Sequence, residues 1–391
     1  MTFFMRIMTD IRLRLHPRTA ALTAAAVVTL MCAVSCGNHQ HEVIVENAIG
    51  LNAFRAGTRA LVTDANDLGS QSVAYGTGFG VYGYKTKSAV NTQIFTNQEV
   101  TASGSTDNYT WSYSPLKYWD MSAYYRYVAY WPYRATGVSH SESGDTHTLS
   151  LSGNPNWQWA SVGYTESGTF SSNDNPDCKD LQYAYSKDEA QNYVTLTNGF
   201  VNFTFNHVLS WLEIQVSSVL STGATSYYIK GLSIGNDGGH GFTTHTGCDI
   251  PDGTGSFTYS LNYSTQDESS MSYGTPGGSN GYASLYPAQT GQELKLTDSY
   301  QLLCSSLCVP FSVTGEGIFL NVTYNTGSGS PDVKKSVAIP LSDTENLKIL
   351  EGGKKYVVKL RFEMGAPLKV VKVYIQDWAD GGSYDSPVYN W

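Results

Sequence analysis

Four side chains that could ligate a metal ion or exchange protons lie within ten consecutive positions: His240, His245, Cys248 and Asp249. Histidine, thiolate and carboxylate together suit zinc or another transition metal, but this spacing matches no known metal module. The glycine-rich run just before them indicates a turn-rich hairpin, which gathers such residues without giving them a function. We therefore expect no metal site here.

The sequence offers little else that could carry out catalysis. It holds no nucleophile elbow, no metal motif on a helix and no acid pair at a catalytic spacing. Asp377 and Asp380 are better explained as turn residues. The glycines of Gly76–Tyr84 (GTGFGVYGY) lie within an alternating strand, whereas a dinucleotide fingerprint needs a strand before it and a helix after it. We expect neither an enzyme nor a bound cofactor.

The six cysteines divide between the N-terminus and the body of the chain. Cys32 lies in the leader described below, and Cys36 follows it. The other four allow three disulfide pairings in an oxidising compartment: Cys178, Cys248, Cys304 and Cys308. Cys304 and Cys308 cannot bridge within one straight strand, because four residues span about 13 Å. They also make a weak zinc motif, since no second pair has a metal-like spacing.

The N-terminus is an export signal. Four arginines precede an apolar core, Ala20–Val34, which is shorter than the ~20 residues of a membrane-spanning helix. The core runs into Ala33-Val34-Ser35-Cys36-Gly37, which is similar to the lipobox of bacterial lipoproteins. We expect lipidation at Cys36; the alternative is an ordinary cleaved signal with Cys36 as a bystander. Residues 1–35 are therefore assigned to a lipoprotein signal peptide.

Composition favours an extracellular β-protein. Charged residues make up 15% of the 391 residues, and the chain contains 28 Tyr and 38 Gly; a typical soluble protein has about 25% charged residues. Loss of residues 1–35, which carry a formal charge of +3, takes the net charge from −9 to −12. An acidic chain without basic patches does not favour phosphate backbones, so we expect no nucleic-acid partner.

The longest strand-like run is Phe200–Val216 (FVNFTFNHVLSWLEIQV). Odd positions are apolar in its first half, and even positions are apolar in its second half. A bulge or kink between His207 and Trp211 would absorb the extra residue. A lone histidine at such a point could be a metal ligand or a base. A packed histidine that satisfies the backbone groups freed by the kink is the better explanation.

An early segment, Val43–Phe54, has the pattern of an edge strand buried on one face. It ends at Arg55, and Arg59 follows after Ala-Gly-Thr. A segment of small residues that carries arginine is accessible to a trypsin-like protease.

Many short strands follow, separated by turn clusters and by two stretches that we interpret as long loops, Gly137–Asn175 and residues 250–286. The first of these loops holds one strand near Trp157–Val162. The pattern predicts an all-β protein, and the length suggests two tandem β-sandwiches. We assign residues 36–190 to an N-terminal domain and residues 191–391 to a C-terminal domain.

Several short motifs occur along the chain in an order that can be compared with known families. They are Ile-x-x-Asn-Ala-Phe at 49–54, Thr58-Arg59-Ala60, Phe79-Gly80-Val81-Tyr82, Trp119, Tyr127-Val128-Ala129-Tyr130-Trp131-Pro132, Asp180-Leu181, Phe203-x-Phe-Asn-His207-x-Leu-Ser, Gly352-Gly353-Lys-Lys-Tyr356 and a last strand that closes on Trp378. With the lipobox, this order resembles the Bacteroidetes fimbrillin family, the subunits of protease-assembled (type V) pili. The likeness covers most of the mature chain.

The resemblance implies transthyretin-like sandwich domains, a lipid anchor in the outer membrane, and cleavage after Arg59 or Arg55 that frees the first strand. An extended segment of another fimbrial subunit then fills the vacated groove, which is β-augmentation in physical terms. In this chain Val43–Phe54 could leave and Val370–Trp391 could replace it. We expect a structural or adhesive fimbrial subunit, with a ligand on a host or bacterial surface as a further partner. The alternative is a glycan-binding surface lipoprotein that does not polymerise, supported by the abundant Tyr and Trp.

Overall fold

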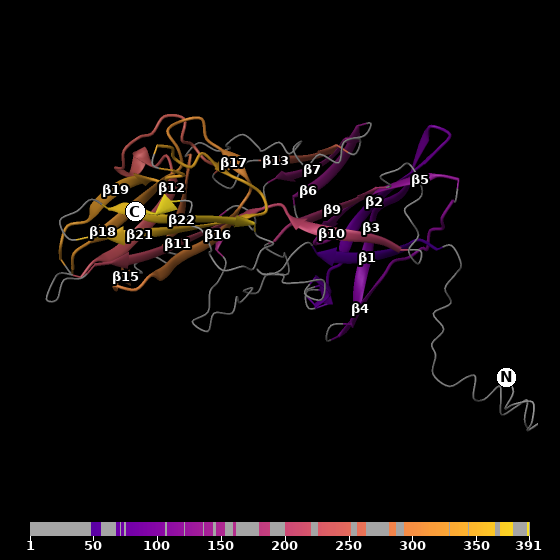
Figure 1. Cartoon of the computed structure of the whole chain (residues 1–391), viewed down its shortest axis with the longest axis horizontal. Helices are drawn as coiled ribbons and strands as arrows, with labels where there is room; N and C mark the ends of the chain where they lie inside the picture. The colour runs from indigo at the N-terminus through magenta and orange to yellow at the C-terminus, as the bar shows by residue number, and fades with distance from the viewer. Residues whose placement is uncertain are drawn as a thin grey trace, which may run out of the picture. The chain divides into compact units, whose positions relative to one another are not determined.

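The structure is a computed structural model that describes residues 48–55, 68–152, 159–161, 180–187, 200–219, 226–262, 281–377 and 389–390, with short gaps inside the longer ranges. The chain divides into two compact units, residues 1–48 and 49–391, and the described residues belong to the second unit apart from Ala48. Nearly all described elements are strands (Figure 1). The all-β class predicted from the sequence is confirmed.

A seven-stranded sheet contains the early strands. Its order is β1-β10-β9-β5-β2-β3-β4, and every neighbouring pair is antiparallel except β1 and β10, which are parallel. The strands are β1 (Gly50–Arg55), β2 (Phe79–Lys87), β3 (Val90–Ser105), β4 (Asn108–Ser112), β5 (Tyr124–Trp131), β9 (Gln182–Lys187) and β10 (Phe200–His207).

Alternating apolar residues of this sheet form one core. In β5, Tyr125, Tyr127, Ala129 and Trp131 all face that core and are buried, as the alternation in the sequence predicts. The Trp131 indole needs a partner when buried, and its Nε1 donates a hydrogen bond to Ser72 Oγ at 3.0 Å. The glycine run at residues 76–84 continues into β2, so the strand interpretation of those glycines is confirmed.

Two further sheets contain most of the later strands. A six-stranded sheet has the order β23-β22-β21-β11-β16-β8, and a five-stranded sheet has the order β14-β12-β18-β19 with β15 on β12. The strands are β8 (Ala160–Ser161), β11 (Ser210–Ser218), β12 (Tyr228–Gly235), β14 (Tyr282–Tyr286), β15 (Leu294–Lys295), β16 (Gln301–Cys308), β18 (Phe319–Asn325), β19 (Val333–Ala338), β21 (Lys354–Phe362), β22 (Lys369–Asp377) and β23 (Tyr389–Asn390).

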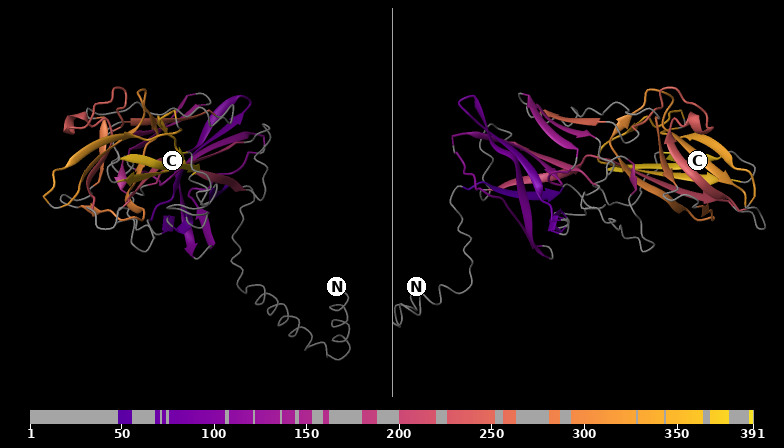
Figure 2. Two further views of the ribbon diagram at one scale, coloured as in Figure 1. Left: turned by 60° about the vertical axis from the view of Figure 1, so that its left-hand side comes forward. Right: turned by 180° about the vertical axis from the view of Figure 1, so that it is seen from behind.

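The two later sheets share one hydrophobic core and therefore form a β-sandwich. Ile214 of β11 and Val358 of β21 enter this core from one sheet, and Ile234 of β12 and Leu320 of β18 enter it from the other. Figure 2 shows these orange and yellow strands gathered together from two further sides. A short two-stranded sheet, β17 (Phe311–Ser312) with β20 (Ile349–Leu350), adds Phe311 and Leu350 to the same core.

The irregularity predicted between His207 and Trp211 is where the chain changes sheets. β10 ends at His207 and belongs to the seven-stranded sheet, whereas β11 begins at Ser210 and belongs to the six-stranded sheet. Val208 and Leu209 alone connect them. The apolar parity reverses because the two halves of the run face two different cores.

Both regions interpreted as long loops contain strands, so that interpretation is wrong. β6 (Val138–Ser143) and β7 (Thr146–Ser152) form a hairpin, and β13 (Ser256–Asn262) pairs with β7 in a three-stranded sheet. β14 also lies in the second of those regions. β6 (VSHSES) has no apolar alternation, but β7 carries Leu149 and Leu151 and β13 carries Phe257, Tyr259 and Leu261 at alternate positions, a strand signal that the Ser and Thr around them obscured. The short strand expected near Trp157–Val162 is present as β8.

A third cluster of buried residues joins elements from both halves of the sequence. It contains Tyr130 and Tyr183 from the early strands, Val208 and Leu209 from the link, and Leu307 from β16. The domain boundary predicted near residue 190 falls between β9 and β10, which are strands of one sheet. The division into two domains stays a prediction. No helix among the described residues is long and apolar enough to cross a membrane.

Candidate functional site

The first strand occupies an edge of the seven-stranded sheet, as the sequence predicts. β1 pairs with β10 in parallel over six residues, from Gly50 beside Phe200 to Arg55 beside Phe205. β9 pairs only with the last two residues of β10, Asn206 and His207. Among the described residues, β1 is therefore the one ladder partner of Phe200–Phe205.

One face of β1 completes a core, and the other face meets water. Ile49, Leu51 and Ala53 are almost completely buried, whereas the Asn52 amide Nδ2 lies 3.5 Å from Asn202 Oδ1 on the exposed side. Full burial of a side chain such as Ile49 or Leu51 contributes about 1.5–3 kcal/mol each. The strand is thus held by apolar contacts and by a single ladder.

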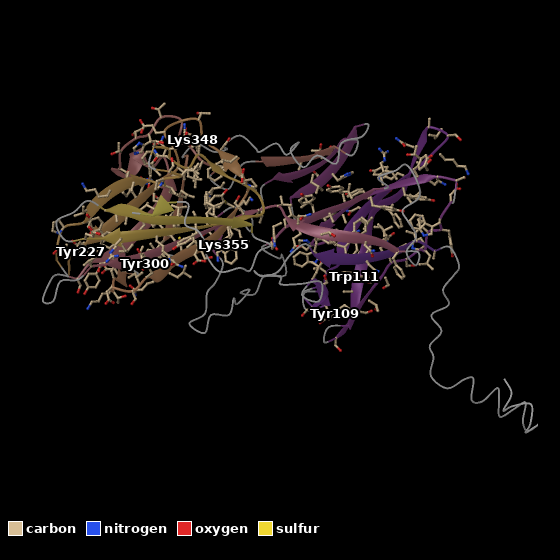
Figure 3. All side chains as sticks on the ribbon, in the orientation of Figure 1. Tyr109, Trp111, Tyr227, Tyr300, Lys348 and Lys355 are labelled. Carbon is tan, nitrogen blue, oxygen red and sulfur yellow. The ribbon has the colours of Figure 1, made fainter. Side chains whose placement is uncertain are left out.

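Aromatic rings form the floor beneath β1. Phe203 and Phe205 of β10 pack edge-on against Phe79, with centroid distances of 5.7 and 5.4 Å. Trp111 of β4, labelled in Figure 3, packs against Phe79 at 4.9 Å, again edge-on. Loss of β1 would expose this floor together with the unpaired edge of β10, and neither is stable in water without a replacement.

The start of β1 is also held from the side of β4. The Tyr113 hydroxyl donates a hydrogen bond to the Ile49 carbonyl at 2.7 Å and accepts one from the Lys117 amide at 3.2 Å. The Ile49 amide donates to the Lys117 carbonyl at 2.8 Å. Burial raises the pKa of Tyr113, so its hydroxyl keeps the proton that it donates. We call β1, the Phe200–Phe205 edge and this Tyr113 contact the β1 groove.

The predicted processing sites lie at or outside the limits of what the structure describes. Arg55 is the last residue of β1, so a cut after it or after Arg59 would leave the ladder of β1 whole. Arg59, Cys36 and Cys178 lie outside the described residues. The roles of Cys36, Arg55 and Arg59 remain predictions.

His207 is buried and contacts a carboxylate. Its Nδ1 lies 3.0 Å from an oxygen of Asp180, and Gln182 Nε2 donates a hydrogen bond to the same carboxylate at 2.8 Å. The Val208 amide donates to the Leu181 carbonyl at 2.9 Å. His207 is thus a packed histidine at the sheet change, as expected, and one of its partners is the side chain of Asp180. Sequence reasoning quoted Asp180-Leu181 only as a motif and did not pair it with His207.

The four metal-capable side chains near residue 240 have separate partners. His240 Nδ1 lies 2.6 Å from Asp237 Oδ1, and the His245 ring stacks on Phe319 with centroids 3.5 Å apart. Cys248 is buried, and Asp249 accepts a hydrogen bond from Asn236 Nδ2 at 2.9 Å. Within the described ranges no three His, Cys, Asp or Glu side chains gather in a way that could hold a metal ion.

The described cysteines, Cys248, Cys304 and Cys308, are buried free thiols, and the last two lie in the core of the later sandwich. Cys304 and Cys308 both lie in β16 and do not bridge, as the strand geometry predicts. Burial raises the pKa of Cys304 to about 12 and that of Cys308 further, so both stay protonated and poorly nucleophilic.

The fold and the β1 groove define an all-β protein whose first strand pairs in parallel at the edge of a sheet and completes an aromatic core. Residues 58–378 match the model of a family described as fimbrillin-like, so the chain belongs to that family. The resemblance seen in the sequence is confirmed. Membership indicates a fimbrial or cell-surface location, association with other fimbrial subunits, and a structural or adhesive role.

A solved structure of a fimbrial protein shows a related fold. A fimbrial protein from Bacteroides vulgatus is 16% identical with a TM-score of 0.51, and the match covers 85% of this chain and 99% of that chain. The fimbrial anchor protein Mfa2 of Porphyromonas gingivalis is 11% identical with a TM-score of 0.31, and the match covers 88% of this chain and 99% of that chain. No curated protein matches this chain by sequence.

Proposed function

We propose that the protein is a fimbrial subunit that assembles by strand exchange in the β1 groove. A protease cuts after Arg59 or Arg55, β1 leaves, and an extended segment of another subunit takes its place beside β10. The observation that supports this most directly is the parallel pairing of β1 with an edge that has no other described partner. Family membership makes a structural role more plausible than catalysis.

The cut alone does not release β1. The six-residue ladder and the buried side chains of Ile49 and Leu51 remain after the peptide bond is broken. An empty groove would leave backbone donors and acceptors unpaired and would expose the aromatic floor to water. Exchange therefore needs both the cut and a competing strand, and the product is stable because the incoming strand completes a core.

The donor is proposed to be the segment after Asp377. β22 lies between β21 and β23 in its own sheet, and its Val370 and Val373 are buried in the sandwich core, so β22 itself stays in place. Among the described residues, β23 pairs with β22 through Tyr389 and Asn390 alone. A pairing this short breaks at little cost in free energy. The last residues of the chain can therefore pair over more residues with another strand.

N-terminal sequencing of the protein isolated from its native envelope tests the proposal. We expect the mature chain to begin at Ala60, or at Ala56 if the cut follows Arg55. A chain in native fimbriae that still begins at Cys36 would contradict proteolytic activation.

The precursor is proposed to be anchored in the outer membrane by lipid on Cys36. A single acyl chain binds membranes only marginally, so firm anchorage requires the multiple acylation of a lipoprotein. Cys36→Ser is expected to move the precursor from the membrane fraction to the soluble fraction and to reduce its mass by the lipid. Cys32→Ser is the matched control and should retain both lipid and membrane. Unchanged partitioning and mass in the Cys36→Ser chain would contradict the anchor.

The second candidate function is a glycan-binding surface lipoprotein that does not polymerise. The observation in its favour is a pocket on β12, β14 and β18 that is lined by both aromatic and polar side chains.

A further inference from the structure

We infer that the later sandwich binds a single neutral sugar ring in a pocket on the outer face of β12, β14 and β18. The pocket has a volume of about 280 Å³ and lies against Ser233, Asn321 and Tyr282 of these strands and Asp237, His240 and Phe242 of the segment that follows β12. Small-molecule sites begin near ~300 Å³, so this one suits one ring rather than a chain.

The pocket lies on the side of the sheet that faces away from the sandwich core. Ser233 lies between Leu232 and Ile234, and Asn321 lies between Leu320 and Val322, and those four neighbours belong to the core. Because side chains alternate along a strand, Ser233 and Asn321 point outward. Both are nevertheless buried, because residues 236–250 fold over this face.

A buried carboxylate in the pocket wall is held in place by hydrogen bonds. Asp237 is 4% exposed, its Oδ2 accepts a hydrogen bond from Ser233 Oγ at 2.5 Å, and its Oδ1 contacts His240 Nδ1 at 2.6 Å. Each carboxylate oxygen can accept two hydrogen bonds, so Asp237 keeps acceptor capacity for hydroxyl groups of a ligand. A carboxylate already fixed by two partners loses little freedom on binding.

Asn321 is fixed in the same way. Its Nδ2 donates to the Gly235 carbonyl at 3.0 Å, and its Oδ1 accepts from Ser336 Oγ at 2.7 Å. Asn321 is 1% exposed, so its amide supports the pocket wall rather than binding the ligand directly. If this sheet face were buried only for stability, apolar residues would stabilise the fold more, because buried polar groups contribute little net free energy.

Aromatic side chains supply the apolar part of the wall. Tyr282 and Tyr286 of β14 and Phe242 of the covering segment line the pocket. Lys334 Nζ donates to the His240 carbonyl at 2.5 Å and lies 5.6 Å from the Phe242 ring centre, so it holds the covering segment on the sheet. Aromatic faces beside fixed polar groups match a pyranose, which has an apolar C–H face and a rim of hydroxyls.

Charge selects among sugars. The Asp237 carboxylate would repel the carboxylate of a uronic or sialic acid, so the ligand is a neutral pyranose at the end of a glycan. None of the pocket's elements belongs to the β1 groove. Binding is therefore expected in the single full-length chain, whether or not it assembles.

Gly231 offers a way to fill the pocket without disturbing the fold. It lines the pocket, and a Cβ built there meets Thr323 Cβ at 3.5 Å, an ordinary contact. Gly231→Leu should therefore fold and block the ring. Gly239→Ala is the matched control, because a Cβ at Gly239 meets nothing within 4 Å and Gly239 is outside the lining. Asp237→Asn removes the charge while it keeps the shape.

The test is saturation-transfer NMR on the full-length protein with methyl pyranosides of glucose, galactose, mannose, fucose and N-acetylglucosamine, and with methyl glucuronide as the anionic control. At least one neutral glycoside should bind. Gly231→Leu, which fills the pocket, and Asp237→Asn, which loses a charge-assisted hydrogen bond, should each weaken that binding roughly tenfold or more. Gly239→Ala should bind as the parent does. Absence of binding by every neutral glycoside, undiminished binding by Gly231→Leu, or equal binding of the glucuronide would overturn the proposal.

Discussion

A chain that carries both Arg55→Ala and Arg59→Ala is expected to fold, to receive its lipid and to remain a monomer. The two substitutions remove the sites at which β1 could be separated from the rest of the chain, and they leave the backbone ladder of β1 untouched. A strand that stays covalently attached returns faster than a separate strand can replace it, because its effective concentration is far higher. No oligomer ladder should therefore form.

The measurement is a mildly denaturing gel of envelope protein from cells that make each variant. The parent should give a ladder of oligomers, and the double variant should give a single band. Arg134→Gln is the control, because Arg134 is an exposed arginine in the turn after β5, far from β1 in the sheet order. Assembly of the double variant at the parent's level would contradict strand exchange and favour the glycan-binding alternative.

Removal of residues 378–391 is expected to abolish self-assembly equally completely while the fold survives. The truncation keeps β22 whole, and among the described residues it removes only the pairing of Tyr389 and Asn390, so the core residues Val370 and Val373 of β22 stay in place. The truncated chain retains its own groove and should still accept a donor from an intact subunit. It should therefore act as a terminator.

Two readouts separate this expectation from simple misfolding. Made alone, the truncated chain should give no oligomers and an unchanged thermal midpoint. Made in excess over the intact chain, it should shorten the oligomer ladder of the intact protein rather than leave it as it was. A full ladder from the truncated chain alone would show that the donor lies elsewhere in the sequence.

The sequence predicts much of this architecture because its half-buried strands alternate clearly. Leu51 and Ala53 in β1 and Phe203 and Phe205 in β10 are buried at the alternate positions that their pattern indicates, whereas in β5 Val128 and Tyr130 are buried as well as the predicted set. The change of parity after His207 also marks the right place. A local kink and a change of sheet give the same pattern, so only the structure distinguishes them.

Other features have no local signal. The parallel pairing of β1 with β10 joins residues 150 positions apart, and nothing in either strand states the direction of its partner. β6 has one apolar residue, Val138, so its sequence shows no strand pattern, whereas the alternation in β7 and β13 is short and lies within Ser- and Thr-rich sequence. The Tyr113 contact with Ile49 and the Asp180 contact with His207 arise from tertiary packing. The carboxylate of Asp237 lies in a glycine-rich turn, where the sequence does not distinguish it from an ordinary turn residue.

The parallel direction of β1 and β10 determines how a joint built there carries load. A strand seated beside β10 and pulled along its own axis strains all six register pairs at once, in shear, rather than opening them one after another. From β10 the tension passes through Val208 and Leu209 into β11, which runs parallel to β21 over eight further pairs. A joint of this kind resists a lengthwise pull far better than a peeling force. It would therefore withstand flow along a filament better than a sideways tear.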